Sequence, residues 1–165
     1  MIHTKLRAGE TAGTYVIAEP VTEAELFEMA QRMARRRLAR GRKILNPSQV
    51  YQAMQTYLSD FDHEVFGLLY LDNAHRSLGF DVLFRGTLRR ASVYTREVVK
   101  DALSQGAAAV IAVHNHPSGL LEPSDEDHEL TDRLRQAFEL IDVRLLDHVI
   151  VSPEGYRSVT RATLP

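Results

Sequence analysis

Two histidines, a serine and an aspartate form the most chemically informative pattern in this sequence. His114 and His116 follow an apolar run at residues 107–113, and Ser124 and Asp127 follow a segment that contains Pro and Gly. Because side chains alternate along a strand, the two imidazoles are predicted to point to the same side. Ser124 has the position of a helix N-cap, so Asp127 falls in the first helical turn, where a carboxylate is favoured and can face the preceding loop.

Two imidazoles and one carboxylate are a ligand set suited to zinc. Three protein ligands leave one position of a four-coordinate ion for water, which is typical of a catalytic site. Bound zinc lowers the pKa of that water from about 16 to about 7. The same spacing also fits a polar strand end followed by an ordinary helix cap, but the occurrence of both signals across one short loop favours a metal site.

The composition bounds the class of protein. The chain has 165 residues, of which 44% are hydrophobic and 25% are charged, and its net charge is −2. These values are typical of one globular domain and give no general case for nucleic-acid binding. The sequence has no Cys, which excludes a thiol nucleophile, a disulfide framework and Cys-ligated zinc. No apolar run reaches the ~20 residues of a membrane span, and no signal peptide is recognisable, so we expect a cytoplasmic protein without a membrane partner.

Hydrophobic periodicity predicts the elements that would position these residues. Residues 1–20 have neither a helical nor a strand period and are expected to form an irregular arm. Helices are predicted at residues 22–40, from Pro47, at 95–104 and from Ser124, and strands at 64–71, 78–84, 107–113, 143–151 and 156–159. Residues 46–165 are therefore expected to form one α/β or α+β domain, preceded by an arm and a helix in residues 1–45.

The helix at residues 22–40 is predicted from its start signal and its apolar face. Thr22 and Glu25 have capping-box spacing, and Gly41 provides a stop. Apolar residues then recur at three- and four-residue steps, at Leu26, Ala30, Met33 and Ala34.

The longer string HNHPSGLLEPSDED connects the pattern to a known family. His-x-His, seven residues and Ser-x-x-Asp are similar to the JAMM (MPN+) motif of JAB-type zinc metallopeptidases. With REVVKDAL and AAAVIAVHNH before it and LLDHVIV after it, the string resembles the RadC family over residues 46–160. The resemblance implies a JAB/MPN-type sandwich of the cytidine-deaminase-like kind. It also implies Zn²⁺ held by His114, His116 and Asp127, and hydrolysis of peptide or isopeptide-linked protein substrates.

The JAMM pattern includes a glutamate on an earlier strand that acts as general base, and Glu64 stands at the matching position. The resemblance implies that Glu64 accepts a proton from the metal-bound water and passes it to the leaving amine. It also implies that Ser124 donates a hydrogen bond to the developing oxyanion. Without the resemblance, Glu64 would be taken for a solvent-facing residue at the start of a strand.

The chain departs from the RadC pattern in three places. RadC proteins commonly carry an N-terminal helix-hairpin-helix module, and we expect this chain to lack one. Leu120 stands where an acidic residue is frequent, and Thr95 stands where Pro is common. The first departure weakens a DNA-directed role, whereas the other two leave the metal ligands untouched.

Three other histidines and one glycine lie near these motifs. His63 should point away from the side of its neighbour Glu64, and His128 is expected on the surface of its helix. His148 lies in an apolar strand, where a buried and hydrogen-bonded imidazole is expected. Gly86 is expected at a turn or a close backbone approach.

A basic cluster precedes the domain. Seven of the twelve residues from Arg32 to Lys43 are Arg or Lys. The cluster could contact DNA phosphates weakly, but the solvated face of a helix with an acidic first half explains it equally simply, and we favour that interpretation. Two function classes remain: a zinc metallopeptidase, or a DNA-repair-associated accessory protein or nuclease. The complete ligand set together with Glu64 favours the metallopeptidase.

Overall fold

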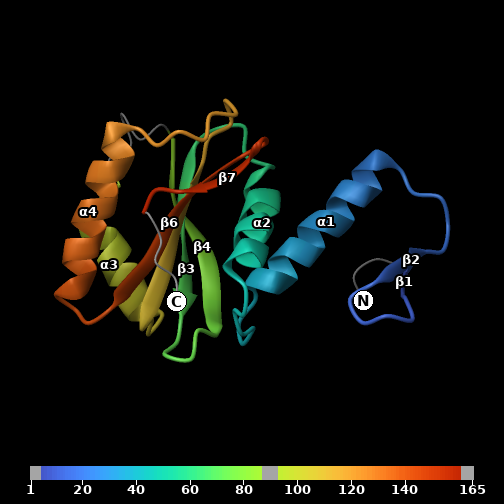
Figure 1. The fold of residues 1–165 in the computed structure, drawn as a ribbon, viewed down its shortest axis with the longest axis horizontal. Helices are drawn as coiled ribbons and strands as arrows, with labels where there is room; N and C mark the ends of the chain where they lie inside the picture. The colour runs from blue at the N-terminus through green and yellow to red at the C-terminus, as the bar shows by residue number, and fades with distance from the viewer. Residues whose placement is uncertain (1–4, 87–92, 161–165) are drawn as a thin grey trace.

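The computed structural model describes residues 5–86 and 93–160 (Figure 1). Within these ranges the elements are β1 (Leu6–Ala8), β2 (Tyr15–Ile17), α1 (Glu23–Leu38), α2 (Pro47–Leu58), β3 (Val65–Leu71), β4 (Ser77–Arg85), α3 (Thr95–Ser104), β5 (Ala109–Asn115), α4 (Asp125–Glu139), β6 (Arg144–Ser152) and β7 (Gly155–Ser158). The helices and strands predicted after residue 20 are confirmed. None of the helices in these two ranges combines the length and the hydropathy that crossing a lipid bilayer requires.

The central sheet contains five of these strands in the order β4–β3–β5–β6–β7. Strands β5 and β6 run parallel, and the other neighbouring pairs are antiparallel. The β3–β5 register pairs Phe66 with His114, and the β5–β6 register pairs Asn115 with Val151. The sheet therefore brings the start of β3 beside the ends of β5 and β6.

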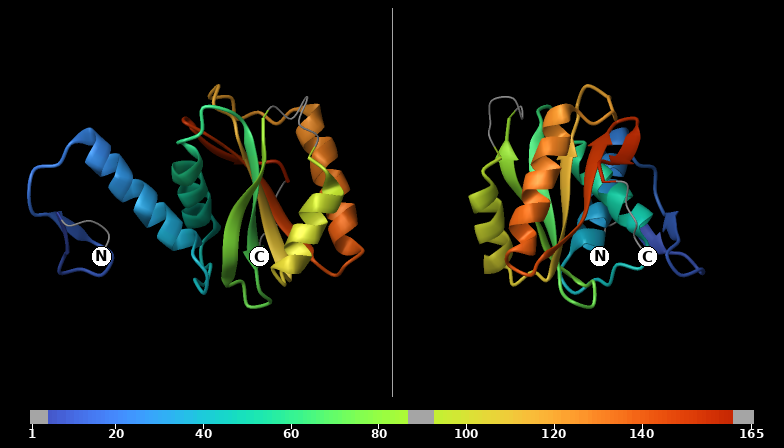
Figure 2. Two further views of the ribbon diagram at one scale, coloured as in Figure 1. Left: turned by 180° about the vertical axis from the view of Figure 1, so that it is seen from behind. Right: turned by 60° about the vertical axis from the view of Figure 1, so that its left-hand side comes forward.

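Helices cover both faces of this sheet. Helix α2 lies on one face, and α3 and α4 lie on the other, as two opposite views show (Figures 1 and 2). Alternate residues of β5 enter the two cores: Ile111 packs in the core that contains Met54 of α2, and Val110 in the core that contains Leu134 of α4. This α/β sandwich with a helical N-terminal extension confirms the predicted fold class, and β5 is buried on both faces as expected.

The predicted irregular arm is wrong for part of residues 5–20, because β1 and β2 form an antiparallel hairpin with Leu6 opposite Ile17. Gly9 donates a backbone hydrogen bond to Thr14 across the turn at 2.9 Å. Each strand has three residues, which is too short to produce a recognisable period. Residues 1–4 of the arm lie outside the described ranges.

Helix α1 begins at its predicted capping box, and its apolar residues are only partly buried. Thr22 is the N-cap and the helix ends at Leu38. Leu26 is 53% exposed, whereas Met29 and Ala34 are buried. The first half of α1 extends beyond α2 towards the hairpin (Figure 1).

Candidate metal centre

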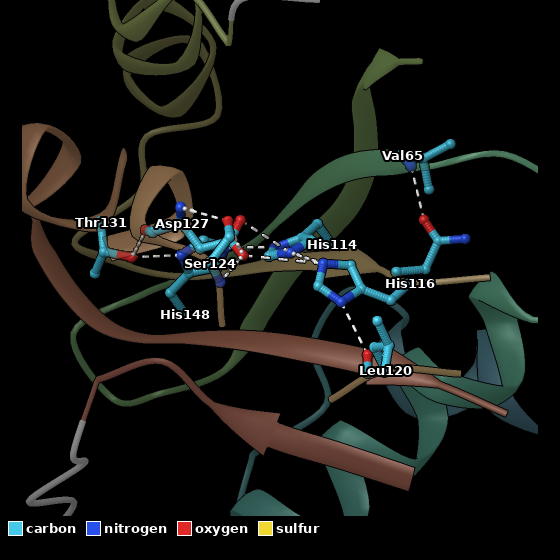
Figure 3. A network of polar contacts seen from close by, with 9 residues as sticks. Val65, His114, His116, Leu120, Ser124, Asp127, Thr131 and His148 are labelled. Carbon is cyan, nitrogen blue, oxygen red and sulfur yellow. Dashed lines mark hydrogen bonds and ion pairs between the residues drawn. The ribbon is translucent and has the colours of Figure 1, made fainter. Parts of the chain in front are cut away.

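Strand β5 and the residue after it deliver two imidazoles to the face that α4 covers. The Nε2 atoms of His114 and His116 lie 2.9 Å apart, so the predicted convergence is confirmed. Asn115 points the other way, accepting from the Val65 N–H at 2.7 Å and donating to the His63 carbonyl at 3.1 Å (Figure 3). These two bonds join the end of β5 to the start of β3.

The first turn of α4 delivers the carboxylate. Ser124 is the N-cap, and its hydroxyl accepts from the Asp127 N–H at 3.2 Å. In return, Asp127 Oδ2 accepts from the Ser124 N–H and from the Ser124 hydroxyl, each at 2.8 Å. The capping box that begins the helix thereby holds the carboxylate with its other oxygen, Oδ1, 3.2 Å from His114 Nε2.

These three side chains form a group that could hold a metal ion. One ligand atom from each of His114, His116 and Asp127 lies within 4.8 Å of the others. Burial, and secondarily the neighbouring His116, lowers the pKa of His114 to about 3, so this imidazole is neutral near pH 7. Asp127 Oδ1 is buried and accepts no hydrogen bond from the described residues. A buried carboxylate oxygen without a donor costs free energy that a cation would recover, so the donor set fits a zinc-type ion.

Glu64 lies immediately before β3 and is half-buried. The β3–β5 register ends at the pair Phe66–His114, so Glu64 lies two residues before the last paired residue of β3, at the end of the sheet where β5 delivers the imidazoles. The Gly86 N–H donates to the Glu64 carbonyl at 2.8 Å. Gly86 has a φ of 112°, a backbone conformation that favours glycine. The backbone thus holds Glu64 at the same end of the sheet as the two imidazoles, and its part as general base stays a prediction.

His148 is buried and hydrogen-bonded, as the sequence predicts, but its partners were not foreseen. Its Nε2 lies 2.9 Å from His114 Nδ1, and its Nδ1 lies 2.6 Å from Thr131 Oγ1 (Figure 3). Thr131 follows Asp127 by four residues, and this spacing on one helix face is the signal that could have found it. His63 and His128 are exposed and outside the group.

Asp147, which precedes His148, has a structural role that is separate from the ligand group. Its carboxylate accepts from the Tyr51 hydroxyl at 2.7 Å, from the His148 N–H at 2.8 Å and from the Ser158 hydroxyl at 2.6 Å. Burial, and then the hydrogen bond to Asp147, raises the pKa of Tyr51 above its usual value. Asp147 therefore joins α2 to β6 and β7.

A hollow of about 210 Å³ adjoins His116. Its lining residues are Gln55, Leu58, Ser59, Phe61, Asp62, Asn115, His116, Pro117, Val151, Ser152 and Pro153. The lining is mostly apolar or uncharged, and within the part of the chain that the structure describes it contains Asp62 but no Lys or Arg.

The basic cluster Arg32–Lys43 is exposed at each of its Arg and Lys residues, which fits both a solvated face and a contact with phosphates. The C-terminal end of the cluster is bound to the β3–β4 connection through the backbone. Lys43 forms an isolated antiparallel β-bridge with Arg76, and the Gly41 N–H donates to the Ser77 carbonyl at 2.7 Å. This is the end of β3 opposite Glu64. A strand of this length separates the two ends by about 20 Å.

Comparisons with known proteins agree with this architecture. A model of the RadC-like JAB domain matches residues 44–164. A UPF0758 protein of Halorhodospira halophila is 53% identical over 125 residues, which are 76% of this chain and 56% of the relative. A UPF0758 protein of Vibrio cholerae is 41% identical over 150 residues, which are 91% of this chain and 95% of the relative.

The sandwich and the family match define a JAB/MPN-type domain. The chain belongs to the RadC family. It spans 56% of the Halorhodospira relative and the same share of a UPF0758 protein of Stutzerimonas stutzeri, to which it is 52% identical over 126 residues.

Proposed function

We propose that this chain is a zinc-dependent hydrolase of JAMM type that cleaves peptide or isopeptide bonds. The observation that carries the proposal is the convergence of His114, His116 and Asp127, with Asp127 Oδ1 buried and without a hydrogen-bond donor among the described residues. Membership of a family with a JAB domain supports it.

In this proposal, the residues around the ligand group have distinct roles. A zinc ion held there would lower the pKa of a water molecule and polarise a carbonyl group. Glu64 accepts a proton at its carboxylate and delivers it to the leaving amine. Ser124 donates to the developing oxyanion, for which its hydroxyl proton turns away from Asp127 Oδ2 while the Ser124 N–H keeps that oxygen bound.

The surroundings of His116 favour a peptide over DNA as substrate. The hollow beside His116 lies on the α2 side of β5 and contacts the ligand group only at His116. Among the described residues its lining includes no Lys or Arg, so it suits an apolar or uncharged side chain better than a phosphate backbone. The basic cluster Arg32–Lys43 lies at the other end of β3. Any contact with DNA through that cluster is therefore separate from the hydrolytic site.

The test compares substrates and variants in parallel. Zinc-loaded and zinc-stripped protein are incubated with peptides, an isopeptide-linked conjugate, and single- and double-stranded DNA. Zinc-loaded wild type should cleave a peptide or isopeptide bond. Glu64→Gln should not, and the matched control Glu129→Gln, exposed on α4, should behave as wild type. Cleavage of DNA that depends on Glu64, with no cleavage of peptide or isopeptide bonds, would replace this proposal by the nuclease alternative.

A further inference from the structure

A buried chain of hydrogen bonds connects helix α4 to the ligand group through β6. Thr131 donates to the Asp127 backbone carbonyl at 2.6 Å, and its hydroxyl also contacts His148 Nδ1 at 2.6 Å. His148 Nε2 in turn contacts His114 Nδ1 at 2.9 Å (Figure 3). Thr131 is 3% exposed, and His114, Asp127 and His148 are fully buried, so water does not substitute for any of these partners.

The positions of the protons along this chain follow from donor and acceptor chemistry. Two oxygens at 2.6 Å require a proton between them, and only the Thr131 hydroxyl can supply it to the Asp127 carbonyl. That hydroxyl therefore accepts from His148, which carries its proton on Nδ1. A neutral imidazole has one N–H, so His148 Nε2 holds a lone pair and accepts the proton of His114 Nδ1.

The result is a lone pair on His114 Nε2, the atom that faces Asp127 Oδ1 at 3.2 Å. His116 reaches the same state by a simpler route, since its Nδ1 donates to the Leu120 carbonyl at 2.9 Å and its Nε2 is left with a lone pair. His114 lies on the buried face of the sheet, where the side chain of His148 takes the place of a backbone acceptor.

We infer that His148, oriented by Thr131, is a positioning residue that fixes the tautomer of His114 so that its Nε2 lone pair faces the metal ion. This role rests on the proposed zinc site and explains why a second buried histidine lies behind the first. Loss of a hydrogen-bond partner that orients a metal-ligating imidazole typically lowers metal affinity by about 10–100-fold.

Matched substitutions separate this role from simple packing. His148→Gln keeps an acceptor for His114, whereas His148→Leu removes it. Thr131→Ser keeps the hydroxyl, whereas Thr131→Val removes it at nearly constant shape. Phe138→Leu is the packing control, because Phe138 is fully buried in the α4 core outside the hydrogen-bonded chain.

The first measurement is zinc affinity by competition with a chromophoric chelator, with Tm recorded for each variant. His148→Leu should bind zinc about 10–100-fold more weakly, His148→Gln should recover most of that loss, and Thr131→Val should fall between wild type and His148→Leu. Phe138→Leu should lower Tm with unchanged affinity. Unchanged affinity in His148→Leu would overturn the inference and leave the zinc site standing, whereas wild type that binds no zinc would overturn the proposed function as well.

The second measurement reads the tautomer itself and does not require His148→Leu to fold. Imidazole ¹⁵N spectra of metal-free wild type should show His114 protonated at Nδ1 and His148 protonated at Nδ1. In Thr131→Val, His114 should lose its single tautomer and show mixed protonation, and Thr131→Ser should restore it. A His114 proton on Nε2 in the wild type would overturn the inference.

Discussion

Asp127 Oδ1 lies 3.2 Å from His114 Nε2, yet no hydrogen bond joins the two fully buried side chains. His114 is not a cation near pH 7, since burial and then His116 lower its pKa to about 3. Two groups that both present lone pairs therefore face each other in the core. An ion that binds this folded arrangement and not the unfolded chain should raise the free energy of unfolding with the logarithm of its concentration once that exceeds the dissociation constant.

This relationship predicts that Asp127→Asn has opposite effects on stability and on metal binding. The new amide can donate from Nδ2 to His114 Nε2 while its oxygen keeps the bonds from Ser124. One added hydrogen bond is worth about 1 kcal/mol, or about 2–4 °C in Tm for a chain of this size. Thermal unfolding with excess chelator should show the rise, and elemental analysis after zinc reconstitution should show loss of the ion. Asp125→Asn, exposed at the start of the same helix, should show neither effect.

Glu64 and His116 should separate catalysis from binding. Glu64→Gln should retain about one zinc per chain and lose about 10²–10⁴-fold in turnover, because a general base acts on the water and not as a ligand. His116→Ala should lose both, leaving less than about 0.2 zinc per chain after reconstitution. Zinc content is measured by elemental analysis on the same samples as turnover, and it distinguishes a general base from a metal ligand. An empty site in Glu64→Gln would reassign Glu64 as a ligand.

Ser124→Ala should lower turnover more than it lowers stability. Loss of the cap costs about 1 kcal/mol, and loss of an oxyanion donor costs about 3 kcal/mol in the transition state. Ser124→Thr keeps both the cap and the hydroxyl and is the matched control. Tm and turnover are measured on the same preparations. A Tm loss of several degrees with an unchanged rate would show that Ser124 acts only as the helix N-cap.

The two buried histidines predict that the metal-free protein loses stability below about pH 6.5. Burial lowers the pKa of His114 to about 3, and burial followed by His114 lowers the pKa of His148 well below its ordinary value. The unfolded chain, with a histidine pKa of about 6.5, then binds protons that the folded state does not. The free energy of unfolding is therefore highest above that pH and falls as pH drops towards about 3.

Between pH 7 and pH 5 this loss should be about 2 kcal/mol from His114, and His148 adds to it in the same direction. Urea unfolding of the metal-free protein at the two pH values measures it. His148→Gln should remove part of the difference, whereas His128→Gln, at an exposed position and with only a minor influence on the pKa of His148, should leave most of it in place. An equal pH dependence in wild type and His148→Gln would contradict the assignment.

DNA binding, where it occurs, should be weak, dependent on salt and independent of zinc. Six or so phosphate contacts lose about 10³-fold in affinity between 50 and 200 mM salt. Changing Arg36→Gln, Arg37→Gln and Arg40→Gln together should reduce binding, and Arg133→Gln on α4 should not. Fluorescence anisotropy with and without chelator tests both points. Binding abolished by chelation would place the DNA at the metal centre instead.

The sequence by itself determined the parts of the site that lie close together along the chain. Strand alternation placed His114 and His116 on one side, and the capping box placed Asp127 in the first turn of α4, because backbone geometry over a few residues controls both arrangements. Periodicity predicted the helices and strands of the main body for the same reason. The short hairpin β1–β2 has too few residues to produce such a signal.

Only the tertiary structure decided which distant residues meet. His148 lies 34 residues from His114 in the sequence, and Tyr51 lies 96 residues from Asp147, yet each pair is hydrogen-bonded. These contacts depend on the strand order and on the register with which β3 and β6 flank β5. The strand order depends on burying both faces of the sheet under helices at the same time. No local pattern in the sequence specifies that order.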